Sequence, residues 1–90
     1  MYLDVVFLGV TGFDLERGAT TLEAEEATVS RAMIRQAKQV IVVADSSKVG
    51  TVSPALICSA SSVHVLVTDT ELPQEKYDAI VAAGIQVIRA

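Results

Sequence analysis

The chain has 90 residues, a formal net charge of −4 and a single cysteine, which limit it to one small domain or part of one. It has no basic run and no aromatic platform, so its own surface is not suited to binding nucleic acid. One cysteine and one histidine exclude an internal disulfide and a structural zinc site. Apolar residues make up 51% of the chain, and we expect some of this surface to be covered from outside.

No apolar stretch approaches the roughly 20 residues that a membrane-spanning helix needs. The first ten residues are apolar, but Asp4 interrupts them and they contain no basic residue, which argues against a signal peptide. We therefore predict a cytoplasmic protein that does not associate with a membrane.

The first predicted elements are a strand over Tyr2–Leu8 and a helix over Thr20–Lys38. The strand ends at Gly9, and the tight turn Gly9–Gly12 can leave backbone N–H groups free. A polar loop, Phe13–Ala19, is predicted between this turn and the helix.

Charge and capping signals define the predicted helix. Thr20 and Glu23 fit a capping box, in which each side chain accepts a hydrogen bond from the other residue's backbone N–H group. The first turns are acidic and the last turn is basic, as the helix dipole favours. Residues spaced by four are predicted to form the buried stripe, with one alanine beside them: Val29, Met33 and Ala37, with Ala32.

The centre of the chain is the segment Gln39–Gly50. Its apolar run, Val40–Ala44, shows no alternation, which is typical of a strand buried on both faces of a parallel sheet. A polar turn with one lysine follows at once, over Asp45–Gly50. The first strand, the helix and this strand make a βαβ unit. Thr51–Cys58 is predicted to be an edge strand or irregular chain, because Pro54 lacks an N–H group.

A second βαβ unit is predicted after a small polar linker at Ser59–Ser62. Its strands are Val63–Val67 and Ile85–Ile88. The helix between them opens at Pro73 and ends at Gly84, in the left-handed position that commonly follows a helix. The predicted fold class is therefore α/β and Rossmann-like, with a mainly parallel sheet and flanking helices.

Three predicted strand ends carry the residues suited to chemistry: Gly9–Gly12, Asp45–Lys48 and Thr68–Thr70. Ligands bind beyond the carboxyl ends of parallel strands, so these turns are predicted to share one site. Glycine N–H groups and Lys48 suit a phosphate group, while the hydroxyls and carboxylates suit the hydroxyl groups of a sugar. This mixture indicates a small polar anion such as a sugar phosphate.

Each of these residues also has a purely structural interpretation. Asp45 can cap its own turn, and Lys48 can be a solvated turn lysine. Thr11 and Gly12 can simply form their turn, and Glu26 can compensate the helix dipole.

The chain lacks the motifs of most cofactor sites and active sites. It has no glycine-rich nucleotide loop, nucleophile elbow or metal-binding cluster, so we expect no cofactor. His64 and Cys58 fit packed residues better than a ligand and a nucleophile. Catalysis would have to use Asp14, Glu16 or Glu26 as a base, and no pattern marks any of them.

Several segments keep a family-like order and spacing: Asp4–Asp14, Glu16–Gly18 with Thr20–Thr21, Glu26–Ala27 leading into Arg31–Ile34, Val40–Gly50, and Val67–Asp69. Together they resemble the C-terminal sensor domain of DeoR-type (GlpR-like) transcriptional repressors. The resemblance covers nearly the whole chain. Its most specific part is the Asp-Ser-Ser-Lys turn with the Gly-x-Thr-Gly turn before it.

The resemblance implies a fold related to that of ribose-5-phosphate isomerase and a domain that binds a phosphorylated sugar or related metabolite. It also implies a set of ligand-binding residues: Lys48, Asp45, Gly9, Thr11, Gly12 and Glu26. The isomerase-like relatives carry acidic residues directly after the first strand, where this chain has Gly-Val-Thr-Gly. The resemblance therefore favours binding over catalysis.

In such repressors DNA is bound by an N-terminal winged helix-turn-helix, which we expect to lie outside these 90 residues. We expect the same of the early part of the sensor domain, with its Asp-x-Gly-Thr-Thr phosphate loop. We therefore expect residues 1–90 to be a single partial domain, the C-terminal part of a sensor domain, that forms a homo-oligomer. Two alternatives stay open, namely a fragment of a sugar-phosphate isomerase-like enzyme and a module that only assembles.

Overall fold

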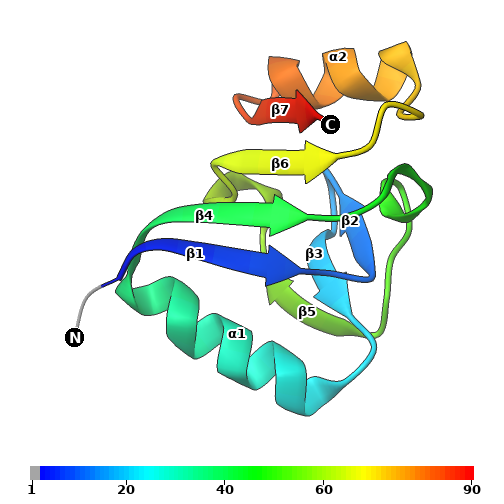
Figure 1. Ribbon diagram of the computed structural model, residues 1–90. Coiled ribbons are helices and arrows are strands. Elements are labelled where there is room, and N and C mark those ends of the chain that lie inside the picture. Colours follow the sequence, from blue (N-terminus) through cyan, green and yellow to red (C-terminus); the bar gives the residue numbers. More distant parts are fainter. Residues whose placement is uncertain (1–2) are drawn as a thin grey trace.

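Four strands form a parallel sheet in the computed structural model, which describes residues 3–90 (Figure 1). In order across the sheet they are β1 (Leu3–Gly9), β4 (Ala37–Val43), β6 (Val65–Thr68) and β7 (Gln86–Arg89). Every neighbouring pair is parallel, and the four arrows point the same way in Figure 1. The predicted α/β class with a mainly parallel sheet is confirmed. Tyr2 of the predicted first strand lies outside the described residues.

The chain also forms a second, smaller sheet that its sequence pattern does not predict. This sheet is antiparallel, in the order β2 (Gly12–Asp14), β3 (Gly18–Thr21) and β5 (Ala55–Cys58). The prediction of a polar loop over residues 13–19 is therefore wrong, because β2 and β3 make a hairpin there. Pro54 directly precedes β5, an outer strand of the small sheet, which agrees with the predicted edge strand.

Two local features build the β2–β3 hairpin. Asp14 Oδ2 accepts hydrogen bonds from the backbone N–H groups of Glu16 at 3.0 Å and Arg17 at 2.8 Å, which fixes the turn. Gly18 adopts a φ of 87°, in the left-handed region that side chains disfavour, and so lets the chain reverse into β3. The polar composition of this segment therefore reflects a turn between strands.

Two α-helices connect strands of the parallel sheet, α1 (Ala24–Gln36) and α2 (Gln74–Ala82). Figure 1 shows α1 along the β1 side of the molecule and α2 beside β7. Short 3-10 turns, η1 (Ser46–Lys48) and η2 (Ala60–Ser62), precede β5 and β6. Gly84, just after α2, has a φ of 91°, which confirms the predicted left-handed cap. Neither α-helix within residues 3–90 has the length and hydrophobicity needed to cross a membrane.

Helix α1 begins later than the sequence predicts. Thr20 and Thr21 are the end of β3, and the N-cap residue is Glu23, whose side chain makes no capping hydrogen bond. The predicted capping box is therefore wrong. Both threonines are β-branched and pair in the ladder with β5, at Leu56 and Ala55, and this pairing prevails over the capping signal.

The buried side of α1 also differs from the predicted stripe. Ala27 is fully buried and Ile34 packs against the core, whereas Val29 is 60% exposed and Met33 is 38% exposed. Ala32 is exposed as well, so the predicted stripe is wrong at these three residues. Helix α1 packs against β5 and β3 as well as β1, and the small side chain of Ala27 lets it lie close to the second sheet.

Within residues 3–90 the parallel sheet is covered on one face. The covered face carries alternate buried residues: Val6, Leu8, Val40, Val42 and Leu66. The other face carries the buried Val65 and, around it, apolar residues that are half-buried or exposed, which we call the open face: Val5, Phe7, Ile41, Val43, Val67 and Ile88. The prediction that Val40–Ala44 is buried on both faces is therefore wrong at Val43, which is 43% exposed.

Candidate functional site

The turns after β1, β4 and β6 meet at one edge of the parallel sheet. The Val10 N–H donates to the Val43 carbonyl at 3.4 Å, and the Ala44 N–H donates to the Val67 carbonyl at 3.0 Å. These bonds join the three strand ends directly, as their common direction predicts. Ligands of parallel α/β sheets bind at this carboxyl edge. We therefore define the candidate site as three turns: residues 9–12, 45–50 and 68–70.

Two carboxylates hold the turn after β4. Asp45 caps η1, because its Oδ1 accepts the Ser47 N–H at 3.1 Å and also the Ser47 hydroxyl. Asp69 accepts the Ser46 N–H at 2.9 Å through Oδ2 and the Glu71 N–H at 2.9 Å through Oδ1. The interpretation of Asp45 as a cap of its own turn is confirmed. The Ser46 and Ser47 N–H groups, which could have held an anion, are occupied by these carboxylates.

The hydrogen bonds to Asp69 lower the pKa of its carboxyl group. The largest cause is the bond from the Ser46 backbone N–H, followed by the Ser46 side chain; desolvation opposes them, and the Glu71 N–H adds to them. A carboxyl group whose pKa is lower in the folded state stabilises the fold above its unfolded pKa of about 3.9. That stabilisation is lost as the pH falls through the folded pKa.

We therefore expect Asp69→Asn to lower the free energy of unfolding near neutral pH. The difference from the wild type should shrink as the pH is lowered from about 5 toward about 2, because the wild-type carboxylate is then protonated. Urea unfolding across this range measures the effect. The control is Asp78→Asn on the exposed surface of α2, where the carboxylate accepts one side-chain hydrogen bond from Gln74. A difference for Asp69→Asn that widens on acidification would contradict the assignment.

The glycine turn after β1 is folded onto β3. The Thr11 N–H donates to the Thr20 carbonyl at 3.1 Å, and the Thr11 and Ser53 hydroxyl oxygens lie 2.7 Å apart. The Thr20 hydroxyl donates to the Gly12 carbonyl at 3.3 Å and accepts the Ser53 N–H at 2.9 Å. Since the N–H groups of Val10 and Thr11 both donate to carbonyls, the expectation of free N–H groups in this turn is wrong for these two.

The two glycines of this turn have different surroundings. A Cβ atom on Gly12 would lie 2.4 Å from the Thr51 carbonyl oxygen and 2.6 Å from Thr20 Oγ1. Gly12 is therefore needed for the close approach of two backbone segments. A Cβ atom on Gly9 would meet no atom within 4 Å. Of the two, Gly9 is the one with open space beside it for a ligand.

Lys48 ends η1, and the residues after it bring this turn beside β2. Val49 makes an isolated parallel bridge with Phe13, and the Gly50 N–H donates to the Phe13 carbonyl at 2.7 Å. Together with the close approach around Gly12, these contacts place the lysine turn and the glycine turn next to each other. The side chain of Lys48 is half-buried, and its ammonium group makes no hydrogen bond or ion pair within residues 3–90.

Glu26 lies apart from these turns, in the first turns of α1. Its Oε2 accepts a hydrogen bond from the Thr21 hydroxyl at 2.9 Å. Thr21 follows Thr20 in β3, so Glu26 connects to the glycine turn through that strand. This bond gives Glu26 a structural role at the start of α1, and its role in binding a ligand stays a prediction.

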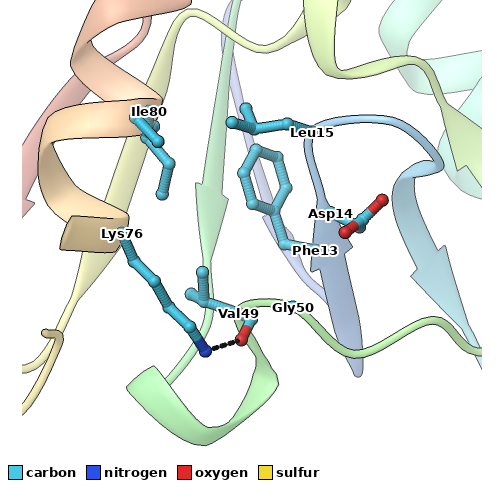
Figure 2. Close-up of a pocket in the computed structure, with 8 residues that line it drawn as sticks. Phe13, Asp14, Leu15, Val49, Gly50, Lys76 and Ile80 are labelled. Atoms are coloured by element: carbon cyan, nitrogen blue, oxygen red, sulfur yellow. Dashed lines mark hydrogen bonds between the residues drawn. The ribbon is translucent and has the colours of Figure 1, made fainter.

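The same edge holds a pocket that the sequence does not predict (Figure 2). Its volume is about 210 Å³, and its lining includes four large apolar side chains and two charged ones: Phe13, Leu15, Val49, Ile80, Asp14 and Lys76. Lys76 comes from the first turn of α2 and donates to the Val49 carbonyl at 2.8 Å, the dashed line in Figure 2. Sequence reasoning missed Lys76. Its position offered a signal, because it begins the helix after β6, close to the edge where ligands bind.

His64 is exposed and lies just before β6, so the prediction that it is a packed strand residue is wrong, whereas Cys58 is half-buried against the core. His64 Nδ1 accepts the Val40 N–H at 2.9 Å and so supports β4 from the neighbouring strand's side. Burial raises the pKa of the Cys58 thiol, and a hydrogen bond with the Ala19 backbone lowers it in part, which disfavours the reactive thiolate. In the part of the chain that the structure describes, no three His, Cys, Asp or Glu side chains gather as a metal site would require.

Residues 1–70 match the family model described as DeoR C terminal sensor domain. The chain is 35% identical over 88 residues to the HTH-type transcriptional repressor GlcR of Bacillus subtilis (strain 168), covering 97% of this chain and 33% of GlcR. It is 34% identical over 85 residues to the HTH-type transcriptional regulator GlpR of Haloferax volcanii, covering 94% and 33%. With the HTH-type transcriptional regulator GolR of Listeria innocua it shares 26% identity over 87 residues, covering 97% and 34%. The chain thus spans about a third of the length of the curated relatives it matches.

Proposed function

The chain belongs to the DeoR family of transcriptional repressors, as part of their C-terminal sensor domain, and from this premise we propose that it binds a phosphorylated sugar or related metabolite. Its relatives are named as HTH-type regulators, and about two thirds of their length lies outside the match. We propose that DNA is bound by a helix-turn-helix in that remaining part, in the cytoplasm. The effector would act by binding one arrangement of the protein better than another, which shifts the population between them.

The observation that carries the proposal is the ammonium group of Lys48, which has no hydrogen-bond or ion-pair partner among residues 3–90 and belongs to a turn beside the glycine turn. A lysine ammonium has three hydrogen-bond donors and binds phosphate as a point charge. The Thr11 and Ser53 hydroxyls suit the hydroxyl groups of a sugar. The hydroxyl of Thr68, at the end of β6, is buried without a hydrogen-bond partner within residues 3–90, which is unusual for a polar group. The Lys48, Thr11 and Ser53 groups support a polar, anionic ligand at this edge, whereas the Thr68 hydroxyl is buried out of its reach.

The alternative, a fragment of a sugar-phosphate isomerase-like enzyme, has less support. The relatives are named as transcriptional regulators, which favours binding without turnover. Asp14, a candidate base, uses Oδ2 to accept two backbone N–H groups in the β2–β3 turn, which gives it a structural role. Turnover of ribose 5-phosphate by the purified chain would favour the enzyme.

Calorimetry with a panel of sugar phosphates tests the proposed function. We expect at least one of them to bind, and Lys48→Met to weaken that binding roughly tenfold to a hundredfold, because a charge-assisted hydrogen bond is lost. The matched control is Lys38→Met. Lys38 is exposed, and its Nζ lies 3.9 Å from Asp4 Oδ1 near the start of β1 and β4, at the opposite end from the candidate site. If no sugar phosphate binds, or if Lys48→Met and Lys38→Met bind equally well, the proposed effector site is wrong.

We also propose that the chain forms homo-oligomers through the open face. This face runs across all four parallel strands and contains no charged residue, whereas parallel sheets are normally covered on both faces. The occupant would be a second copy of the chain, because two such faces can bury each other.

Sedimentation velocity tests this proposal. We expect Val43→Glu to weaken self-association roughly tenfold or more, because a carboxylate would be buried between two apolar faces. The control is Leu22→Glu, since Leu22 is 65% exposed and lies outside the open face. A wild-type chain that stays monomeric at all concentrations, or equal effects of the two variants, would exclude this interface.

A further inference from the structure

The pocket between the β2–β3 hairpin and α2 has a size and lining that suit a small apolar group. Its volume is about 210 Å³, and it is open to solvent on one side. Phe13, Val49 and Ile80 supply buried apolar side chains to its wall. Such a cavity has little to offer a sugar hydroxyl, because a buried polar group needs a hydrogen-bond partner. The pocket therefore favours an alkyl, acyl or aryl group of a few heavy atoms.

Lys76 places a positive charge at this pocket. Its ammonium group uses one of three N–H donors on the Val49 carbonyl, at 2.8 Å. Among residues 3–90, no carboxylate lies within ion-pair distance of the Lys76 ammonium. The ion pair present there is between Asp4 and Lys38. Figure 2 shows the ammonium beside Val49 and Gly50. A Cβ atom on Gly50 would lie 3.2 Å from Lys76 Nζ, so the glycine keeps the space around the ammonium open.

Lys48 belongs to the turn after β4, and Lys76 contacts the same turn from α2. Lys48 directly precedes Val49 in the chain, and Lys76 contacts Val49 from α2. An anion bound beside Val49 would therefore meet the Lys76 ammonium, and Lys48 is the neighbouring residue in the chain. The apolar pocket opens beside the same residues.

We propose that the pocket is the part of the effector site that selects the substituent of the ligand, and that Lys76 is a second residue that binds its anionic group. The ligand class is a phosphorylated small molecule that carries an apolar substituent. This inference rests on the proposed function, since it names a further residue and the substituent class of the same site.

Calorimetry with the 90-residue chain tests the pocket. The two probes are inorganic phosphate and phenyl phosphate, which differ by one apolar ring. We expect phenyl phosphate to bind roughly tenfold more tightly than inorganic phosphate, because its ring is transferred from water into the apolar pocket. Ala79→Leu should remove this preference by filling the pocket that Ala79 lines. The control is Ala82→Leu, an exposed position of the same helix that does not line the pocket.

The charge of Lys76 is tested by Lys76→Gln, which keeps an N–H donor for the Val49 carbonyl and removes the positive charge. We expect it to weaken both probes roughly tenfold, while circular dichroism stays unchanged. Equal affinities of the wild type for the two probes, or a ring preference that survives in Ala79→Leu, would overturn the pocket assignment. Unchanged phosphate affinity in Lys76→Gln would overturn the role of Lys76.

Failure of this inference and failure of the proposed function are distinguishable. Sugar-phosphate binding that requires Lys48 but is unaffected by Lys76→Gln and Ala79→Leu would overturn the inference and leave the proposed function intact. Binding of phenyl phosphate that requires Lys76 and the open pocket but not Lys48, with no sugar phosphate binding, would support the pocket and overturn the proposed function.

Discussion

Replacing Phe13 with alanine is expected to lower the free energy of unfolding by about 3 to 5 kcal/mol. Phe13 is fully buried, its side chain forms a wall of the pocket, and its backbone bridges Val49. Removing the ring deletes its contacts and leaves a cavity that neighbouring strands cannot fill. Small domains have a total stability of roughly 5 to 15 kcal/mol, so this variant would be close to unfolding. Urea unfolding followed by circular dichroism measures the loss.

The matched control is Phe7→Ala, because the chain has two phenylalanines in opposite environments. Phe7 lies on the open face and is 66% exposed. At concentrations where the chain is monomeric, its replacement should change stability by no more than about 0.5 kcal/mol. Similar losses for the two variants would mean that Phe13 is not the centre of the core, or that the open face is covered in solution.

The second large effect is expected for Gly12→Ala, at roughly 3 kcal/mol of lost stability. The new methyl group would lie 2.4 Å from the Thr51 carbonyl oxygen, which belongs to the backbone and cannot rotate away. The turn and the segment after η1 would therefore have to separate. This separation would disturb the hydrogen bonds that join Thr20 to Gly12 and Ser53.

Gly9→Ala is the control in the same turn, because its methyl group would meet no atom within 4 Å. We expect it to leave stability within about 0.5 kcal/mol of the wild type. Thermal and urea unfolding of both variants compare them directly. If Gly9→Ala destabilises the chain as much as Gly12→Ala does, the turn does not have the geometry described. If Gly9→Ala is stable but binds a sugar phosphate poorly, Gly9 lines the ligand site.

The parallel sheet could be predicted because its strands have clear sequence signals. Val40–Val43 is a continuous apolar run, and Pro73 and Gly84 bracket α2 closely. Such signals are local, since each depends on residues adjacent in the chain. The parallel direction of β6 and β7 follows from the βαβ unit that α2 closes, whereas β4 and β6 are neighbours although β5 lies between them in the chain.

The second sheet and the buried side of α1 depend on contacts that are distant in the sequence. Thr20 and Thr21 become strand residues because β5, more than thirty residues later, pairs with them. The same sheet lies against α1 and selects Ala27 for burial, while Val29 and Met33 stay exposed. No local pattern in residues 18–36 shows that this partner exists, so the capping signal and the hydrophobic spacing predicted the wrong boundaries.

The meeting of the three turns at one edge was predictable from the sequence, but the roles of the individual residues there were less so. The polar turns do meet at the carboxyl edge, and Lys48 lies in a turn beside the glycine turn. The structure shows that Asp45 caps η1 and that Gly12 permits a close backbone approach, and the sequence alone left both roles open. The position of Lys76 at the start of the helix after β6 offered a signal, but its contact with the turn after β4 appears only in the folded chain.

The bond from the Gly50 N–H to the Phe13 carbonyl has a consequence for how a signal could leave this edge. It ties the loop that follows the parallel strand β4 to the first strand of the antiparallel sheet. A ligand that displaces this loop must either break this hydrogen bond or move β2 together with the loop. The motion would then reach α1 through β3, and so arrive at Val29 and Met33 on the exposed side of that helix.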